Sequence, residues 1–185
     1  MKIVMKKLFW MLALLYSSNA VAQKVYTKNG NVSFFSKTPL EDISADNNQV
    51  TAVFNQQTGD LQFSLLIKSF HFKKALMEEH FNENYMESGK FPKAVFKGKL
   101  NNLGAVDFTK DGSYPVIVTG DLSIHGITKN VSVPGRIVIQ GSVISTSGSF
   151  NVIPGDYGIK IPRLVRDNIA QNINITVNCM YTQKM

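Results

Sequence analysis

The residues that could carry chemistry are few, and their spacing matches no familiar reactive site. The three histidines, His71, His80 and His125, are the natural candidates for metal ligands. Metal ligands must converge on one point, whereas His71 and His80 are too far apart to share a helical face as an i, i+4 pair. His125 precedes Gly126 and is better explained as part of a turn. We therefore expect no bound metal.

The glutamates, serines and cysteine do not indicate catalysis either. Glu78, Glu79 and Glu83 could pair for acid–base work, but the solvated face of a helix, paired locally with lysines, explains them more simply. No serine lies in a Gly-x-Ser-x-Gly elbow, and no glycine-rich phosphate loop precedes a helix. Cys179 is the only cysteine, and its alternation with apolar neighbours indicates a buried small side chain. We therefore expect no enzyme activity.

Phenylalanine, by contrast, is frequent, with 12 copies against a single tryptophan. Large apolar side chains can fill the core of a domain or line a cavity for an apolar ligand, and composition alone does not separate the two. A chain of 185 residues that is 44% hydrophobic and 18% charged is typical of one globular domain.

The N-terminus has the three parts of a secretory signal peptide. Three lysines come first, an apolar run at residues 8–16 follows, and Ala20-Val21-Ala22 supplies small residues for cleavage. Polar residues from Ser17 onward end the run well short of the ~20 apolar residues that span a bilayer. We expect residues 1–22 to be a signal peptide cleaved after Ala22. Residues 23–185 would then be the mature domain, in a periplasmic or secreted protein.

Charge points to no nucleic-acid partner. Losing three lysines with the signal peptide reduces a formal net charge of +7, which leaves a mildly basic chain without a block of Lys or Arg. Lysine-rich faces such as that of Lys93, Lys97 and Lys99 leave no apolar belt for lipid, so we also expect no stable insertion of the domain in a membrane. The oligomeric state is left open.

Most of the remaining chain alternates between apolar and polar residues, as strands with one buried face do. The Asn29-Gly30 pair predicts a hairpin turn, and turns are expected at His125-Gly126 and Gly141-Ser142. Pro134-Gly135 predicts a bulge or bend within a strand. The count of about eight or nine short antiparallel strands is typical of a closed barrel or a sandwich. The expected strands are residues 25–27, 32–36, 50–54, 61–67, 94–100, 114–124, 131–140, 143–152 and 173–181.

Two segments interrupt the strands with helical spacing. Phe72, Leu76, Phe81 and Tyr85 recur every four or five residues among charged residues, which predicts one amphipathic helix that covers the open end of the barrel or sandwich. Residues 162–170 are expected to form a short second helix. Its apolar side would carry Leu164, Val165 and Ile169.

Three motifs in the chain resemble one family. They are residues 91–98 (FPKAVFKG), residues 120–129 (GDLSIHGITK) and Asp156-Tyr157-Gly158-Ile159. Together they resemble the YceI-like family of exported lipocalin-like proteins, which bind polyisoprenoid-type lipids in an antiparallel barrel. Where other members often carry an Arg-Asp pair before the helix, this chain has Lys73-Lys74-Ala75-Leu76-Met77, which leaves the polar end of a ligand open.

The resemblance implies an all-β fold, an antiparallel lipocalin-like barrel of about eight strands with one amphipathic helix and a short second helix. It also implies a long apolar lipid inside the barrel, a polyisoprenoid or an isoprenoid quinone, bound for transport, storage or sequestration. No cofactor is expected besides such a lipid. The alternative is an exported, stress-related structural barrel with a filled core and no ligand. The residues expected to contact the lipid are Phe63, Leu65, Phe72, Leu76, Phe81, Phe96, Ile124 and Phe150.

Overall fold

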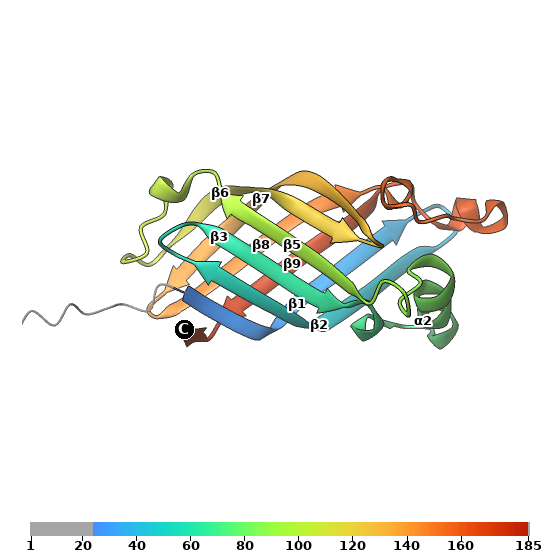
Figure 1. Cartoon of the computed structure of the whole chain (residues 1–185), viewed down its shortest axis with the longest axis horizontal. Coiled ribbons are helices and arrows are strands. Elements are labelled where there is room, and N and C mark those ends of the chain that lie inside the picture. The colour runs from blue at the N-terminus through green and yellow to red at the C-terminus, as the bar shows by residue number, and fades with distance from the viewer. Residues whose placement is uncertain (1–23, 185) are drawn as a thin grey trace, which may run out of the picture.

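The chain forms one antiparallel sheet that closes into a barrel (Figure 1). The computed structural model describes residues 24–184, so the expected signal peptide and its cleavage site lie outside the described residues. The barrel strands follow one another in chain order, and pairing of the last with the first closes the sheet. They are β1 (Lys24–Lys37), β2 (Asp42–Asn55), β3 (Asp60–Leu66), β5 (Lys93–Leu100), β6 (Gly112–Ile124), β7 (Ile127–Gln140), β8 (Val143–Val152) and β9 (Ile173–Tyr181). The expected all-β antiparallel barrel is confirmed.

Two short strands extend this barrel at its edges. Strand β4 (His71–Phe72) pairs with β2, and β10 (Gln183–Lys184) pairs with the first residues of β1. No helix within residues 24–184 is long and apolar enough to cross a bilayer.

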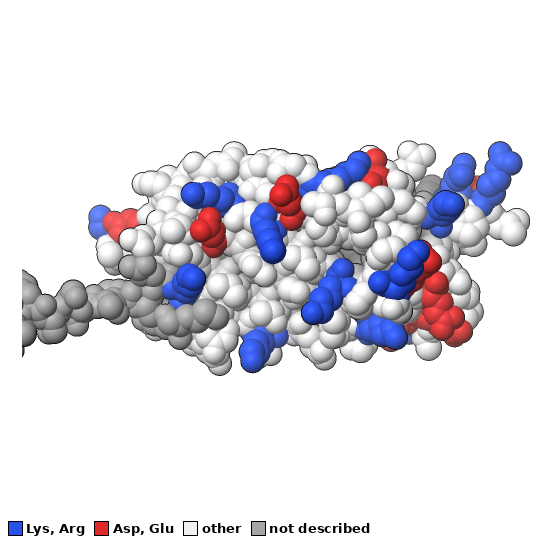
Figure 2. Space-filling model, viewed as in Figure 1, with Lys and Arg blue, Asp and Glu red and all other residues white. Residues whose placement is uncertain are grey.

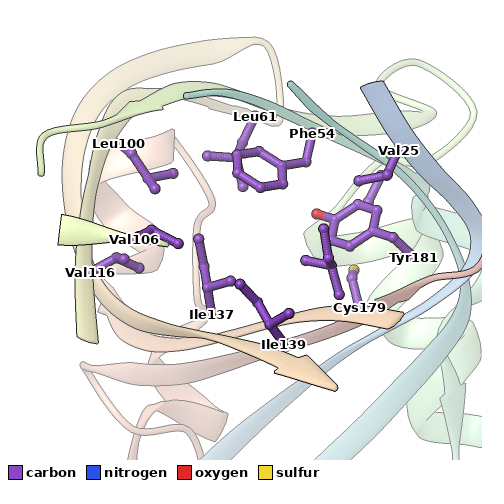
Figure 3. Close-up of a cluster of buried hydrophobic side chains, with 12 residues drawn as sticks. Val25, Phe54, Leu61, Leu100, Val106, Val116, Ile137, Ile139, Cys179 and Tyr181 are labelled. Carbon is purple, nitrogen blue, oxygen red and sulfur yellow. The ribbon is translucent and has the colours of Figure 1, made fainter. Parts of the chain in front are cut away.

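One end of the barrel is filled by a packed core. Alternate residues of each strand point inward, and Figure 3 shows side chains from strands all around the barrel pointing toward one another. Both described termini and the 3-10 turn η4 (Leu103–Ala105) lie at this end (Figure 1). The buried core residues are Val25, Ala52, Phe54, Leu61, Leu100, Val106, Val116, Ile137, Ile139, Ile144, Cys179 and Tyr181.

The opposite end carries most of the helical turns. The amphipathic helix begins as α2 (Ala75–His80) and continues as a π-helical turn, η3 (Phe81–Tyr85), while the 3-10 turn η2 (Ile67–Ser69) precedes it. The 3-10 turns η5 (Pro154–Tyr157) and η6 (Arg163–Asn168) lie at the same end (Figure 1). The barrel therefore has one closed, packed end and one end covered by irregular segments, which we call the mouth.

The expected second helix forms as the 3-10 helix η6, and its expected apolar side is partly wrong. Val165 and Ile169 face the barrel interior, but the Leu164 side chain is 98% exposed. A 3-10 helix has three residues per turn, so Val165 and Asn168 share the inner side and Leu164 is turned outward.

The hairpin predicted at Asn29-Gly30 is wrong, because β1 runs through these residues as one strand. A type I′ turn needs positive φ at both central residues, whereas neither of these residues has one. Instead, the β1–β2 register shifts on both sides of Gly30, which is typical of a bulge. Gly30 makes room for Cys179, since an added Cβ would lie 2.5 Å from its Sγ atom. Burial of that thiol raises its pKa to about 12.

At Pro134-Gly135, where a bulge or bend was expected in place of a continuous ladder, the bulge is wrong but the ladder is interrupted on one side. Strand β7 pairs with β6 through Pro134 without any shift in register. On its other side, the β7–β8 ladder extends only to the pair Gly135 with Gly148. Pro134 therefore lies just beyond the end of that ladder, where its missing N–H group costs no hydrogen bond. The turns at His125-Gly126 and Gly141-Ser142 form as predicted.

Candidate ligand-binding cavity

A cavity of about 530 Å³ lies in the half of the barrel between the packed core and the mouth. Its lining is almost wholly apolar. All eight residues predicted to contact a ligand line this one cavity: Phe63, Leu65, Phe72, Leu76, Phe81, Phe96, Ile124 and Phe150. Their contact with a ligand stays a prediction, but the structure brings them together from seven different elements.

Strands β3 and β5 supply the most regular part of the cavity wall. Phe63 is paired with Phe96, and their ring centroids are 6.1 Å apart. Leu65 is paired with Ala94 on the same face. Leu76 is different, because its side chain is 61% exposed and so stands at the rim rather than deep in the cavity.

A cluster of four phenylalanines, Phe34, Phe70, Phe72 and Phe81, forms the cavity wall beneath the helix. The Phe81 ring centroid lies 5.0 Å from that of Phe72, 5.4 Å from that of Phe34 and 5.6 Å from that of Phe70. Phe81 is the first residue of the π-helical turn that follows α2. The cluster attaches the helix to the barrel in the position of a partial lid.

Charged groups lie at the rim of the cavity. Lys74, which precedes α2, places its Nζ atom 2.9 Å from Oε1 of Glu41 in the β1–β2 turn. His80, at the end of α2, also borders the cavity. An apolar interior with a few polar groups at its opening suits a ligand with a hydrocarbon body and a small polar end.

Comparison with known proteins agrees with this geometry. Residues 23–180 match the model of the YceI-like domain. The chain belongs to the YceI-like family. A search of curated proteins finds no match.

Solved structures share the fold of this chain at low sequence identity. A polyisoprenoid-binding domain from Saccharophagus degradans, implicated in plant cell wall breakdown, is 11% identical, with a TM-score of 0.74 over 87% of this chain and 98% of that one. BcnA from Burkholderia cenocepacia is 17% identical, with a TM-score of 0.67 over 83% and 96%. The YceI protein of Campylobacter jejuni is 17% identical, with a TM-score of 0.61 over 76% and 85%. These likenesses confirm the lipocalin-like barrel.

The histidine of the second family motif joins three segments of this YceI-like chain. His125 occupies the β6–β7 turn at φ 51° and is only 10% exposed. Its Nδ1 atom lies 3.1 Å from the carbonyl oxygen of Tyr157, and its Nε2 atom lies 2.9 Å from Oε2 of Glu87. The ring also packs on Phe91, with centroids 4.4 Å apart. We call this arrangement the His125 clasp; it ties the segment after the helix and η5 to one turn.

The other two histidines do not join it. His71 is exposed, with Nδ1 3.7 Å from Oε2 of Glu78, and the same carboxylate accepts a hydrogen bond from the Phe72 backbone N–H. Glu78 therefore contacts His71 and Phe72, which precede its own helix, and not a lysine as expected. Within residues 24–184, no three His, Cys, Asp or Glu side chains gather in a way that could hold a metal. The expected absence of a metal stays a prediction.

The sequence reasoning missed one wall of the cavity. Residues 154–169, of which only 162–169 fall within an element expected from the sequence, contribute Tyr157, Ile159, Ile161, Val165 and Ile169 to the lining. This segment packs beside the part of β7 that does not pair with β8, where Lys129 Nζ lies 3.2 Å from Asp156 Oδ2. The alternation of Ile159 and Ile161 with Lys160 was the available sign of a one-sided segment.

Replacing His125 with asparagine is expected to reduce the free energy of unfolding by about 1–3 kcal/mol, because Glu87 and the Tyr157 carbonyl lose their partner. Asparagine tolerates positive φ, so the change tests the clasp and not the turn. Denaturant titration gives the value, and hydrogen exchange should show faster opening of residues 87–91 and 154–158. The exposed His71→Asn serves as control, with a change within about 0.5 kcal/mol. Equal stability of the two variants would contradict a role for the clasp.

Proposed function

We propose that this protein binds the hydrocarbon chain of a long apolar lipid, a polyisoprenoid or an isoprenoid quinone, inside its barrel. The observation that carries the proposal is the apolar cavity of about 530 Å³ between the packed core and the mouth. Its size lies in the range of cavities that hold small molecules, and burial of apolar surface contributes about 25 cal/mol per Å². The solved relative from Saccharophagus degradans, described as polyisoprenoid-binding, supports this ligand class.

The cavity also favours a carrier over a structural barrel with a filled core. A barrel that served only as a rigid structure would gain stability from close packing throughout its interior, since unfilled apolar space weakens a core. Here the interior packs closely at the closed end and around Phe70 in the cavity wall, yet an apolar cavity of about 530 Å³ remains between the core and the mouth. Because the lining offers hydrocarbon and aromatic surface with charge only at the rim, we propose binding for transport, storage or sequestration and not catalysis.

Export belongs to the same proposal. The Lys-rich start, apolar run and Ala20-Val21-Ala22 support cleavage after Ala22 and a periplasmic or secreted location. A lipid that must cross an aqueous compartment needs a carrier that hides its hydrocarbon chain from water.

The test is solvent extraction of protein purified without detergent, followed by mass spectrometry of the extract and of the intact chain. We expect close to one isoprenoid-type lipid per protein, and an intact mass that begins at or near Gln23. If the extract is empty, delipidated protein should still take up added polyprenol or ubiquinone. An empty extract together with no uptake would contradict the proposed function.

A further inference from the structure

The segment 159–169, which closes one side of the cavity, has two chemically different faces. Its inner residues, Ile161, Val165 and Ile169 among them, line the cavity. Its outer face carries three exposed cations, Lys160, Arg163 and Arg166, which recur every three residues, and one exposed acid, Asp167. In the 3-10 helix η6, this spacing places Arg163 and Arg166 on the same side. Between them, Leu164 projects into solvent.

The neighbouring β1–β2 turn repeats the same combination. Leu40 is 69% exposed, and Lys37 beside it is exposed as well. The two loops adjoin, since Lys37 and Leu40 line one shallow groove with Asp167 and Ala170. The backbone N–H of Ala170 donates to the Ser36 hydroxyl at 2.9 Å, which holds the loops together. We define the basic-leucine patch as Lys37, Leu40, Lys160, Arg163, Leu164 and Arg166.

We propose that the basic-leucine patch docks the mouth of the barrel on a bilayer that contains anionic phospholipids. Isolated exposed leucines are common on soluble proteins, but here two of them stand among four cations beside the opening of an apolar cavity. Cations pair with lipid phosphates while apolar side chains enter the boundary between headgroups and acyl chains. Docking in this position would let a lipid pass between bilayer and cavity; that step rests on the proposed function.

Charge distribution gives the docked molecule an orientation. The helix side of the mouth carries both signs, because Glu78, Glu79 and Glu83 lie on α2 and η3 while the exposed Lys73 and Lys74 directly precede α2. Figure 2 shows mainly positive side chains at the η6 end of the mouth, and negative side chains next to positive ones over α2. An anionic surface would attract the η6 end more strongly than the helix side, so η6 and the β1–β2 turn face the bilayer. A protein partner fits less well, because the patch offers no aromatic anchor and no deep pocket.

The test is flotation of the processed protein with vesicles of phosphatidylcholine alone or mixed with phosphatidylglycerol. Wild type should float with the mixed vesicles only, and high salt should release it. At about 1 kcal/mol per cation, K160E/R163E/R166E should bind roughly 100-fold more weakly. Leu164→Ser should bind roughly tenfold more weakly, since one leucine no longer leaves water.

Two matched variants serve as controls. K28E/K97E/K99E makes the same change in charge at exposed strand positions away from the patch. Met180→Ser removes a 57% exposed apolar side chain near the closed end. Both should float like wild type. If both triple variants lost vesicle binding equally, net charge alone would explain the binding, and the proposal would be overturned.

Docking and cargo binding can fail separately. Wild type that carries lipid but never floats would overturn docking and leave the proposed function standing. Wild type that floats through the patch but neither carries nor takes up lipid would contradict the proposed function alone. Patch-dependent cross-linking to a protein, without binding to vesicles, would assign the patch to a protein partner and overturn the membrane proposal.

Discussion

Replacing Gly120 with valine is expected to prevent the chain from folding. Gly120 of β6 pairs directly with Gly98 of β5. A Cβ atom at position 120 would overlap the Gly98 Cα atom and the Lys97 carbonyl oxygen. These are backbone atoms of a paired strand, so no side-chain rotation can relieve the overlap. The strands would have to separate, at a cost above about 4 kcal/mol, which is a large part of the stability of a small domain.

Circular dichroism and the yield of soluble protein measure the outcome for Gly120→Val. Gly89→Ala is the matched control, because an added Cβ there meets nothing within 4 Å. It should fold with stability close to that of wild type, since the same kind of change is made without overlap. A well-folded Gly120→Val with an unchanged unfolding midpoint would show that the two strands do not approach so closely in solution.

The Gly98–Gly120 pair also gives Phe96 its position. An added Cβ at Gly98 would lie 2.5 Å from Cζ of Phe96, so the phenyl ring lies over the glycine. Both glycines belong to the motifs that resemble the family. Their absent side chains let strands β5 and β6 approach closely and turn the Phe96 ring along the cavity wall.

Most of the barrel could be predicted because alternation of apolar and polar residues is a local property of each strand. Residues 143–152 and 173–181 form strands with the expected bounds. The errors in the strands lie where a glycine or proline has a partner far away in sequence. Asn29-Gly30 carries the pattern of a turn, but Gly30 is required by Cys179 on β9, which only the folded barrel brings close.

The candidate site also has a part that could be predicted from local sequence and a part that could not. The eight predicted lining residues share a cavity because the parity of a strand and the stripe of a helix are set locally. The wall formed by residues 154–169 was missed because no single period runs through it: Ile159 and Ile161 alternate with one lysine only, before the helical spacing of Val165 and Ile169 begins. The contacts of His125 could not be predicted from the sequence either, since Glu87 and Tyr157 lie 38 and 32 residues away in the chain.

Replacing Ala94 with phenylalanine is expected to remove lipid binding while the fold survives. Ala94 faces the cavity beside Leu65, so the added ring enters space that a hydrocarbon chain would occupy. If the ring displaces about four methylene groups at ~0.8 kcal/mol each, affinity falls by more than about 100-fold. Uptake of added polyprenol or quinone by delipidated protein measures the loss.

Comparison with Ala52→Phe distinguishes a carrier from a filled barrel. Ala52 is fully buried in the packed core at the closed end, so the same ring there must push neighbouring side chains apart. It should lower the free energy of unfolding by about 1–3 kcal/mol or more, whereas Ala94→Phe should leave it nearly unchanged or raise it. Two equally destabilised variants would mean that the space beside Ala94 is filled in solution, and the barrel would then be structural.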